Sequence, residues 1–223
     1  QGAALAGLAL GALLLSEARA DEPYRMNRGQ VRVRPFYGIK EIAFDGELHQ
    51  PPAGALADLS IEAETRSGFR IGFDLAPLMF LAPRPQITAR LHLGYANELL
   101  AISMGLGSGL TWLYPQAGPV IRIGRHEGAH AHFRLSFSLY PPRPLPVDAD
   151  LDVLVPVHPR LRLQLNVGGG YGNLIGVYGT VGTQVLLARQ GVRGATRLSV
   201  GVGVAWVQYY LGPTGLAGLE QLF

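Results

Sequence analysis

The chain has 223 residues and no cysteine, so disulfide bonds and thiolate metal sites are excluded. Its net charge is only +3, Lys40 is the single lysine, and no cluster of basic residues is visible, which argues against a nucleic-acid partner. Glycine is plentiful with 30 residues, charged residues make up 16%, and the length fits one all-β domain.

The N-terminal segment has the pattern of an export signal. Residues 3–15 (AALAGLALGALLL) form an apolar run that is too short for a transmembrane helix, which needs about 20 apolar residues. Ala18, Arg19 and Ala20 then supply an A-x-A cleavage site. We predict a signal peptide over residues 1–20, truncated at its start and cleaved after Ala20. The alternative is a buried N-terminal helix.

The rest of the chain, residues 21–223, alternates between apolar and polar residues, the pattern of strands with two different faces. After a polar lead-in, residues 30–39 form the first predicted strand. A change of phase after it indicates a bulge near Lys40 and Glu41. Gly and Pro residues make residues 45–58 the longest predicted loop.

Two long alternating segments follow. Residues 59–75 alternate without a break, and we favour one long strand here over a hairpin with a three-residue loop at residues 66–68. In residues 85–112 the apolar set changes from odd to even positions across Asn97 and Glu98. A tight two-residue turn requires this change, so the segment is predicted to be an antiparallel hairpin.

The second half of the chain repeats the pattern. We predict turns at residues 116–118 and 125–128, and strands at residues 120–124, 130–140, 150–157, 160–171, 175–187 and 196–210. Either a short final strand then follows Pro213, or residues 206–210 are the true end of the strand pattern. The result is a single all-β, antiparallel, up-and-down barrel of about ten strands, within a range of about eight to twelve.

Alternation alone does not show which face of a closed sheet is outside. Strands of roughly 11–15 residues are longer than those of globular proteins and long enough to cross a bilayer. The polar face consists of Gly, Ser, Ala, Thr and Arg with almost no Lys, which suits a narrow interior. Aromatic residues such as Tyr95, Trp112 and Tyr210 lie towards strand ends, as interfacial girdles do. We therefore predict a transmembrane β-barrel.

With this pattern, residues 30–210 resemble bacterial outer-membrane β-barrel proteins of the small type. The resemblance implies a porin-like protein of a Gram-negative outer membrane, without a cofactor, and with the lipid bilayer and the barrel assembly machinery as partners. Such proteins usually end in an aromatic residue that this machinery recognises, and Phe223 is the last residue here. Gly212-Pro213 and Gln221 depart from the family's alternation.

On this interpretation the charged side chains face the lumen. The predicted lumen-lining residues are Arg32, Arg34, Glu62, Glu64, Arg66, Arg70, Asp74, Arg90, His92, His130, His132, Arg134, Asp150, Asp152, Arg160, Arg162 and Arg197. Opposite charges on sequential strands suggest cross-strand pairs. Two alternatives follow: a salt-bridged plug that conducts little, or a narrow polar pathway or ligand cavity.

The polar face also contains residues that could carry chemistry. His130 and His132 have a spacing that can chelate zinc or copper, with aspartates of the next strand completing a site. We expect polar packing instead, and no metal. Ser136 and Ser138 lie on the same face, but the sequence has no G-x-S-x-G motif that would mark a nucleophile.

We predict no enzymatic activity and a structural role, or passive transport or binding of a small polar solute. One alternative is a periplasmic barrel that resembles lipocalins and holds an apolar ligand among Leu91, Leu135, Val155 and Val202. A second is a membrane-embedded lipid-modifying enzyme that uses His132. The oligomeric state stays open.

Overall fold

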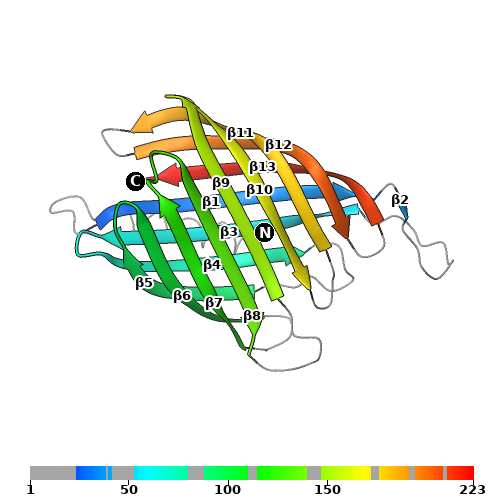
Figure 1. Cartoon of the computed structure of the whole chain (residues 1–223), viewed down its shortest axis with the longest axis horizontal. Helices are drawn as coiled ribbons and strands as arrows, with labels where there is room; N and C mark the ends of the chain where they lie inside the picture. The colour runs from blue at the N-terminus through cyan, green and yellow to red at the C-terminus, as the bar shows by residue number, and fades with distance from the viewer. Residues whose placement is uncertain are drawn as a thin grey trace, which may run out of the picture.

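The computed structural model shows a closed antiparallel β-barrel of twelve long strands (Figure 1). It describes residues 24–38, 40–41, 53–79, 88–109, 115–139, 147–171, 176–190, 194–207 and 210–223. The strands are β1 (Tyr24–Tyr37), β2 (Lys40–Glu41), β3 (Ala53–Thr65), β4 (Phe69–Met79), β5 (Thr88–Ala96), β6 (Leu100–Gly109), β7 (Pro115–Gly124), β8 (His130–Ser138), β9 (Val147–His158), β10 (Leu161–Tyr171), β11 (Gly176–Gln190), β12 (Gly194–Val207) and β13 (Tyr210–Leu222). In this part of the chain no helix is long and apolar enough to cross a membrane.

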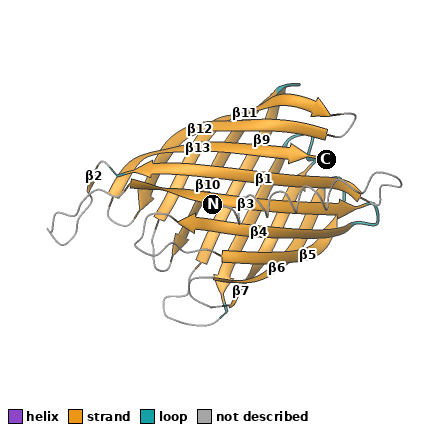
Figure 2. Cartoon of the chain, turned by 180° about the vertical axis from the view of Figure 1, so that it is seen from behind, coloured by secondary structure: helices purple, strands orange, loops and turns teal. Residues whose placement is uncertain are grey.

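The barrel closes because its first and last long strands pair with each other. From β3 to β13 each strand pairs with the next along the chain, and β1 pairs with both β3 and β13, as in Arg28 opposite Leu222. The short β2 extends this seam with a one-residue offset, which fits the predicted bulge. Figure 1 shows β9 and β10 crossing in front of β1 and β3, and Figure 2 shows β1 and β3 nearest the viewer from behind. These two pairs of strands therefore lie in opposite walls.

The two faces of the sheet differ sharply in chemistry. Val202, Val181 and Leu106 are 76%, 63% and 62% exposed on the outer face. Arg32 and Glu62, on the inner face, are 3% and 2% exposed. The apolar face is therefore outside and the charged face inside, as predicted for a transmembrane barrel. This orientation contradicts the lipocalin-like alternative, which needs an apolar interior.

The predicted number of about ten strands is two too low, because residues 59–75 are a hairpin and not one strand, and because residues 196–210 belong to two strands. β3 ends at Thr65 and β4 begins at Phe69, and the turn between them places Gly68 at a φ of 91°. The Phe69 amide donates a hydrogen bond to Thr65 Oγ1 (2.9 Å). A three-residue turn keeps the same parity on both sides, so the alternation passes through it without a visible break.

Further predicted boundaries are also wrong. The turn predicted at residues 116–118 lies inside β7, whose polar and small residues gave no apolar alternation. The strand predicted over residues 196–210 divides between β12 and β13. β13 runs through Pro213, which is exposed, so the last strand has full length. Within the predicted loop at residues 45–58, β3 already begins at Ala53. The predicted signal peptide lies outside the described residues.

Candidate functional site

Charged side chains from most of the strands are buried inside the barrel. The structure buries these predicted lumen residues on the inner face: Arg32, Arg34, Glu62, Glu64, Arg70, Asp74, Arg90, His92, His130, His132, Arg134, Asp150, Asp152, Arg162 and Arg197. Arg66 and Arg160 are exposed, so the prediction is wrong for these two. Both lie in hairpin turns beyond the strand ends, where alternation no longer decides the direction of a side chain.

Sequence reasoning missed Arg28, Asp58, Arg122 and Glu220, which are buried as deeply. Arg28 continues the alternation of β1 backwards into the predicted lead-in, and Asp58 continues that of β3 into the predicted loop. Extending the two-residue period beyond the assumed strand ends would have found both.

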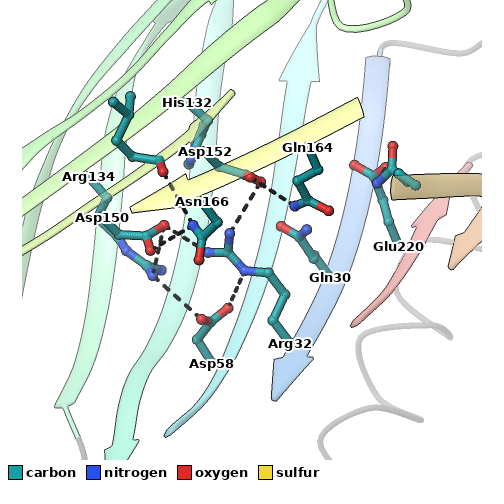
Figure 3. Close-up of polar contacts among 12 residues, drawn as sticks. Gln30, Arg32, Asp58, His132, Arg134, Asp150, Asp152, Gln164, Asn166 and Glu220 are labelled. Atoms are coloured by element: carbon teal, nitrogen blue, oxygen red, sulfur yellow. Dashed lines mark hydrogen bonds and ion pairs between the residues drawn. The ribbon is translucent and has the colours of Figure 1, made fainter. Parts of the chain in front are cut away.

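Five ion-paired residues of the interior, Arg32, Arg34, Asp58, Asp150 and Asp152, are here called the central layer. Figure 3 labels four of them, Arg32, Asp58, Asp150 and Asp152. Arg32 projects from β1 and donates through Nε to Asp58 Oδ1 on β3 (2.9 Å). Its other nitrogens donate to Asp150 Oδ1 (3.0 Å) and Asp152 Oδ2 (3.2 Å) on β9. Because β9 lies in the opposite wall, this one guanidinium spans the barrel.

Arg34 makes a second connection across the same layer. It donates through Nη1 to Asp58 Oδ2 (2.6 Å) and through Nε to Asn166 Oδ1 on β10 (2.7 Å). Its guanidinium also lies 4.8 Å from the ring centre of Tyr178, a cation–π contact. The Tyr178 hydroxyl donates to Asp150 Oδ2 (2.5 Å). Side chains thus tie β1 to β9, β10 and β11, with which it shares no backbone pairing, and add to its pairing with β3.

A further set of contacts centres on Glu62 of β3. Its Oε1 lies 2.7 Å from Arg70 Nη2 on β4 and 3.3 Å from His132 Nε2 on β8. Nearby, Arg122 Nη2 of β7 donates to Glu64 Oε2 (3.2 Å). β7 and β8 are therefore also joined to the opposite side of the barrel.

Asp74 of β4 is the centre of another such set. Arg90 Nη2 of β5 donates to its Oδ2 (3.1 Å), and Arg134 Nη1 of β8 lies 3.8 Å from its Oδ1. Arg90 Nη1 also donates to the backbone oxygen of Leu135 (2.8 Å). Glycine makes room for these side chains: a Cβ on Gly105 would lie 2.9 Å from Arg90 Cδ, and one on Gly72 would overlap the His92 ring.

At one end of the barrel, here called the mouth, the β7–β8 turn (residues 125–129) contacts β10, β12 and β13. His126 Nε2 of this turn lies 3.5 Å from Glu220 Oε1 on β13, and its ring stacks on His130 at 5.0 Å. Burial lowers the pKa of His126 below its ordinary value, and the Glu220 carboxylate opposes this only in part. The neutral imidazole is therefore favoured at pH 7.

Comparison with solved structures reveals the fold. An outer membrane channel from Pseudomonas putida F1 matches with a TM-score of 0.54 over 88% of this chain and 94% of that one, at 10% identity. A structure from a study of in-meso crystallization of membrane proteins matches with a TM-score of 0.50 (89% and 83% covered, 9% identity), and a KdgM porin with 0.48 (86% and 97%, 11%). Protein-family models and curated proteins give no match. The chain has the outer-membrane β-barrel fold.

The polar residues considered for metal or lipid chemistry contact other side chains of the barrel interior. The structure describes no group of three or more His, Cys, Asp or Glu residues that could hold a metal ion. His132 points inward to Glu62, away from the lipid-facing surface where a lipid substrate would lie. Ser136 Oγ donates to Gln116 Oε1 (2.9 Å), so this hydroxyl binds an amide and not a general base.

Proposed function

We propose that the protein is an outer-membrane β-barrel with a structural role, whose interior is closed to free diffusion by the central layer. The observation that carries this proposal is the contact of Arg32 on β1 with Asp150 and Asp152 on β9 in the opposite wall. A solute moving along the barrel axis has to break these buried ion pairs, which are costly to leave unpaired.

The outer face and the predicted export signal support the proposed location in the outer membrane. The exposed valines and leucines of the strands suit a bilayer, residues 1–20 would direct export, and Phe223 would be recognised by the barrel assembly machinery. Cell fractionation and gel mobility with and without boiling test this. The expected result is outer-membrane protein with a heat-dependent shift. A soluble periplasmic protein without a shift would contradict the proposal.

Conductance in planar lipid bilayers tests the closed interior. The wild-type barrel is expected to show no steady conductance. Arg32→Ser/Arg34→Ser removes both connections of β1 across the central layer and should open a conducting path. Arg66→Ser, which changes an exposed turn residue, is the matched control and should stay closed. The heat-dependent mobility shift confirms that each variant has folded.

A second candidate is passive transport of a small polar solute, favoured by the amides that complete the lining beside the ion pairs. Gln164 Nε2 donates to Asp152 Oδ1 (2.8 Å), and Gln184 Nε2 donates to Glu220 Oε2 (2.9 Å). Such a lining can solvate an ion or a sugar. Steady conductance of the wild-type protein would support this candidate and exclude the closed interior.

A further inference from the structure

The β7–β8 turn reaches from one wall of the mouth to strands far round the barrel. His126 approaches Glu220 on β13, which lies nearly halfway round the ring of strands from β7 and β8. The next residue, Glu127, approaches Arg162 near the start of β10 and Arg197 of β12. In Figure 1 this end of the barrel is the one at which the C-terminus lies.

Two arginines at the mouth converge on a single carboxylate. Arg197 Nη2 donates to Glu127 Oε2 (3.2 Å), and Arg162 Nη2 lies 3.8 Å from the same oxygen. Both arginine side chains are only 6% exposed, whereas that of Glu127 is 66% exposed. The carboxylate therefore sits at the water-facing side of two buried cations, and a solute can replace it without entering the barrel.

The two arginines have few other acceptors. Within the part of the chain that the structure describes, buried Arg197 Nη1 has no hydrogen-bond partner, and its ion pair with Glu220 Oε2 is long at 3.6 Å. Glu220 already accepts a hydrogen bond from Arg28 Nε at 2.6 Å. Arg162 otherwise binds neutral oxygens, those of Gln184 (3.3 Å) and of the Glu127 backbone (3.0 Å). The mouth thus has guanidinium N–H donors that lack a charged acceptor of their own among the described residues.

A cavity of about 140 Å³ lies at these donors. Its lining includes Glu127, His158, Arg160, Arg162, Arg189 and Arg197, so four arginines and one glutamate border it. Arg160 and Arg189 are exposed at its rim. Guanidinium groups bind carboxylates and phosphates through paired, charge-assisted hydrogen bonds, and several around one small cavity favour an anion over a neutral solute.

We propose that the mouth is a binding site for a small oxyanion, a phosphate or carboxylate group, which displaces Glu127 from Arg162 and Arg197. In the structure the Glu127 carboxylate occupies the place of the ligand. Displacement releases the Glu127 carboxylate from β10 and β12, while the contact of His126 with Glu220 and the hydrogen bond from Arg162 Nη2 to the Glu127 backbone oxygen (3.0 Å) still hold the turn across the barrel. This site goes beyond the proposed structural role.

Isothermal titration calorimetry tests the site on the full mature chain, refolded in neutral detergent. Inorganic phosphate is the first probe and malonate the second, and binding of at least one is expected. Glu127→Gln removes the competing charge and should tighten binding about tenfold. Arg162→Gln/Arg197→Gln should abolish it. Arg125→Gln is the matched control, because Arg125 lies on the same turn but is exposed, and among the described residues its ion pair is with exposed Glu98 at 3.6 Å.

The outcomes separate clearly. Binding lost in the double variant, kept in Arg125→Gln and tightened in Glu127→Gln supports the site. No binding of either probe, equal binding in the double variant, or unchanged affinity in Glu127→Gln overturns it. Tighter binding of a short-chain anionic phospholipid than of free phosphate would assign the site to a lipid headgroup, and the reverse to a free solute. The heat-dependent mobility shift controls for folding.

Discussion

The central layer and the mouth use the same residue types in opposite ways. In the central layer Arg32 binds three buried carboxylates, all within 3.2 Å. At the mouth, Arg162 and Arg197 share the exposed carboxylate of Glu127. Because water competes for Glu127 and not for Asp150 or Asp152, the first set of contacts is fixed and the second is replaceable. Exposure of the acid, and not the number of charges, separates the two regions.

The largest expected effect comes from removing the arginine of each region in turn. Arg32→Met leaves three carboxylates buried without their cation and should lower the free energy of unfolding by about 3–5 kcal/mol. Arg162→Met leaves an exposed glutamate and should cost about 1 kcal/mol or less. Urea unfolding followed by tryptophan fluorescence measures both.

A compensated variant sharpens this difference. If unpaired charge causes the loss, Arg32→Met combined with Asp58→Asn, Asp150→Asn and Asp152→Asn should regain much of the stability, because neutral side chains tolerate burial better. Equal losses in Arg32→Met and Arg162→Met would show that both regions are equally rigid and would refute the comparison.

The second prediction tests whether the charged face is the inner one, on which the comparison depends. Val202 lies in the middle of β12 and is 76% exposed on the outer face. Val202→Arg should cost about 2–4 kcal/mol in a bilayer, since a cation there contacts lipid. Leu187→Arg, near the end of β11, should cost about 0–1 kcal/mol. Similar small costs at both positions, measured by unfolding in lipid vesicles, would place the outer face in water.

The third prediction compares how tightly the two regions are packed. A Cβ on Gly72 would overlap the buried His92 ring, whereas one on Gly128 of the β7–β8 turn would meet Arg125 Cβ at an ordinary 3.6 Å. Gly72→Ala should therefore destabilise the barrel by about 1–3 kcal/mol. Gly128→Ala should stay within about 0.5 kcal/mol of the wild type. A tolerated Gly72→Ala would mean that the interior has free space.

The smallest expected effect is a pH dependence at the mouth. Because burial lowers the pKa of His126 in the folded protein, the unfolded chain binds the proton first as the pH falls below about 6.5. Stability is therefore lost on acidification from pH 7.5 to 5.5, and His126→Gln should lose less. Arg125→Gln on the same turn should keep the wild-type slope. An unchanged slope in His126→Gln would show that the imidazole does not titrate in this range.

Much of the fold could be predicted because one physical rule, the alternation of two faces, applies along almost every strand. It identified the barrel, the antiparallel order and the inner face of residues such as Arg32 and Asp150. The rule failed to give strand boundaries where alternation does not mark them. The turn after Thr65 preserves parity, and β7 has too few apolar residues to show any alternation.

The site was less predictable, because alternation gives the direction of a side chain but not its partner. Sequence order predicts contacts between neighbouring strands, such as β1 and β3, and Arg32 and Asp58 do form such a contact. It cannot reveal the contact of Arg32 with Asp150, since that depends on the curvature that brings opposite walls together. The contacts of Glu127 with Arg162 and Arg197 across the mouth cannot be predicted from the sequence for the same reason.

The seam between β1 and β13 has a consequence for how the chain is made. Arg28 pairs with Leu222, and the Phe223 amide donates to the Asn27 oxygen (3.0 Å), so the first strand meets the very last residues. Until β13 has been synthesised and exported, β1 has an unpaired edge and the arginines of the interior have no enclosed space. Closure is therefore a late, long-range event, and folding of this barrel should be slow relative to translation.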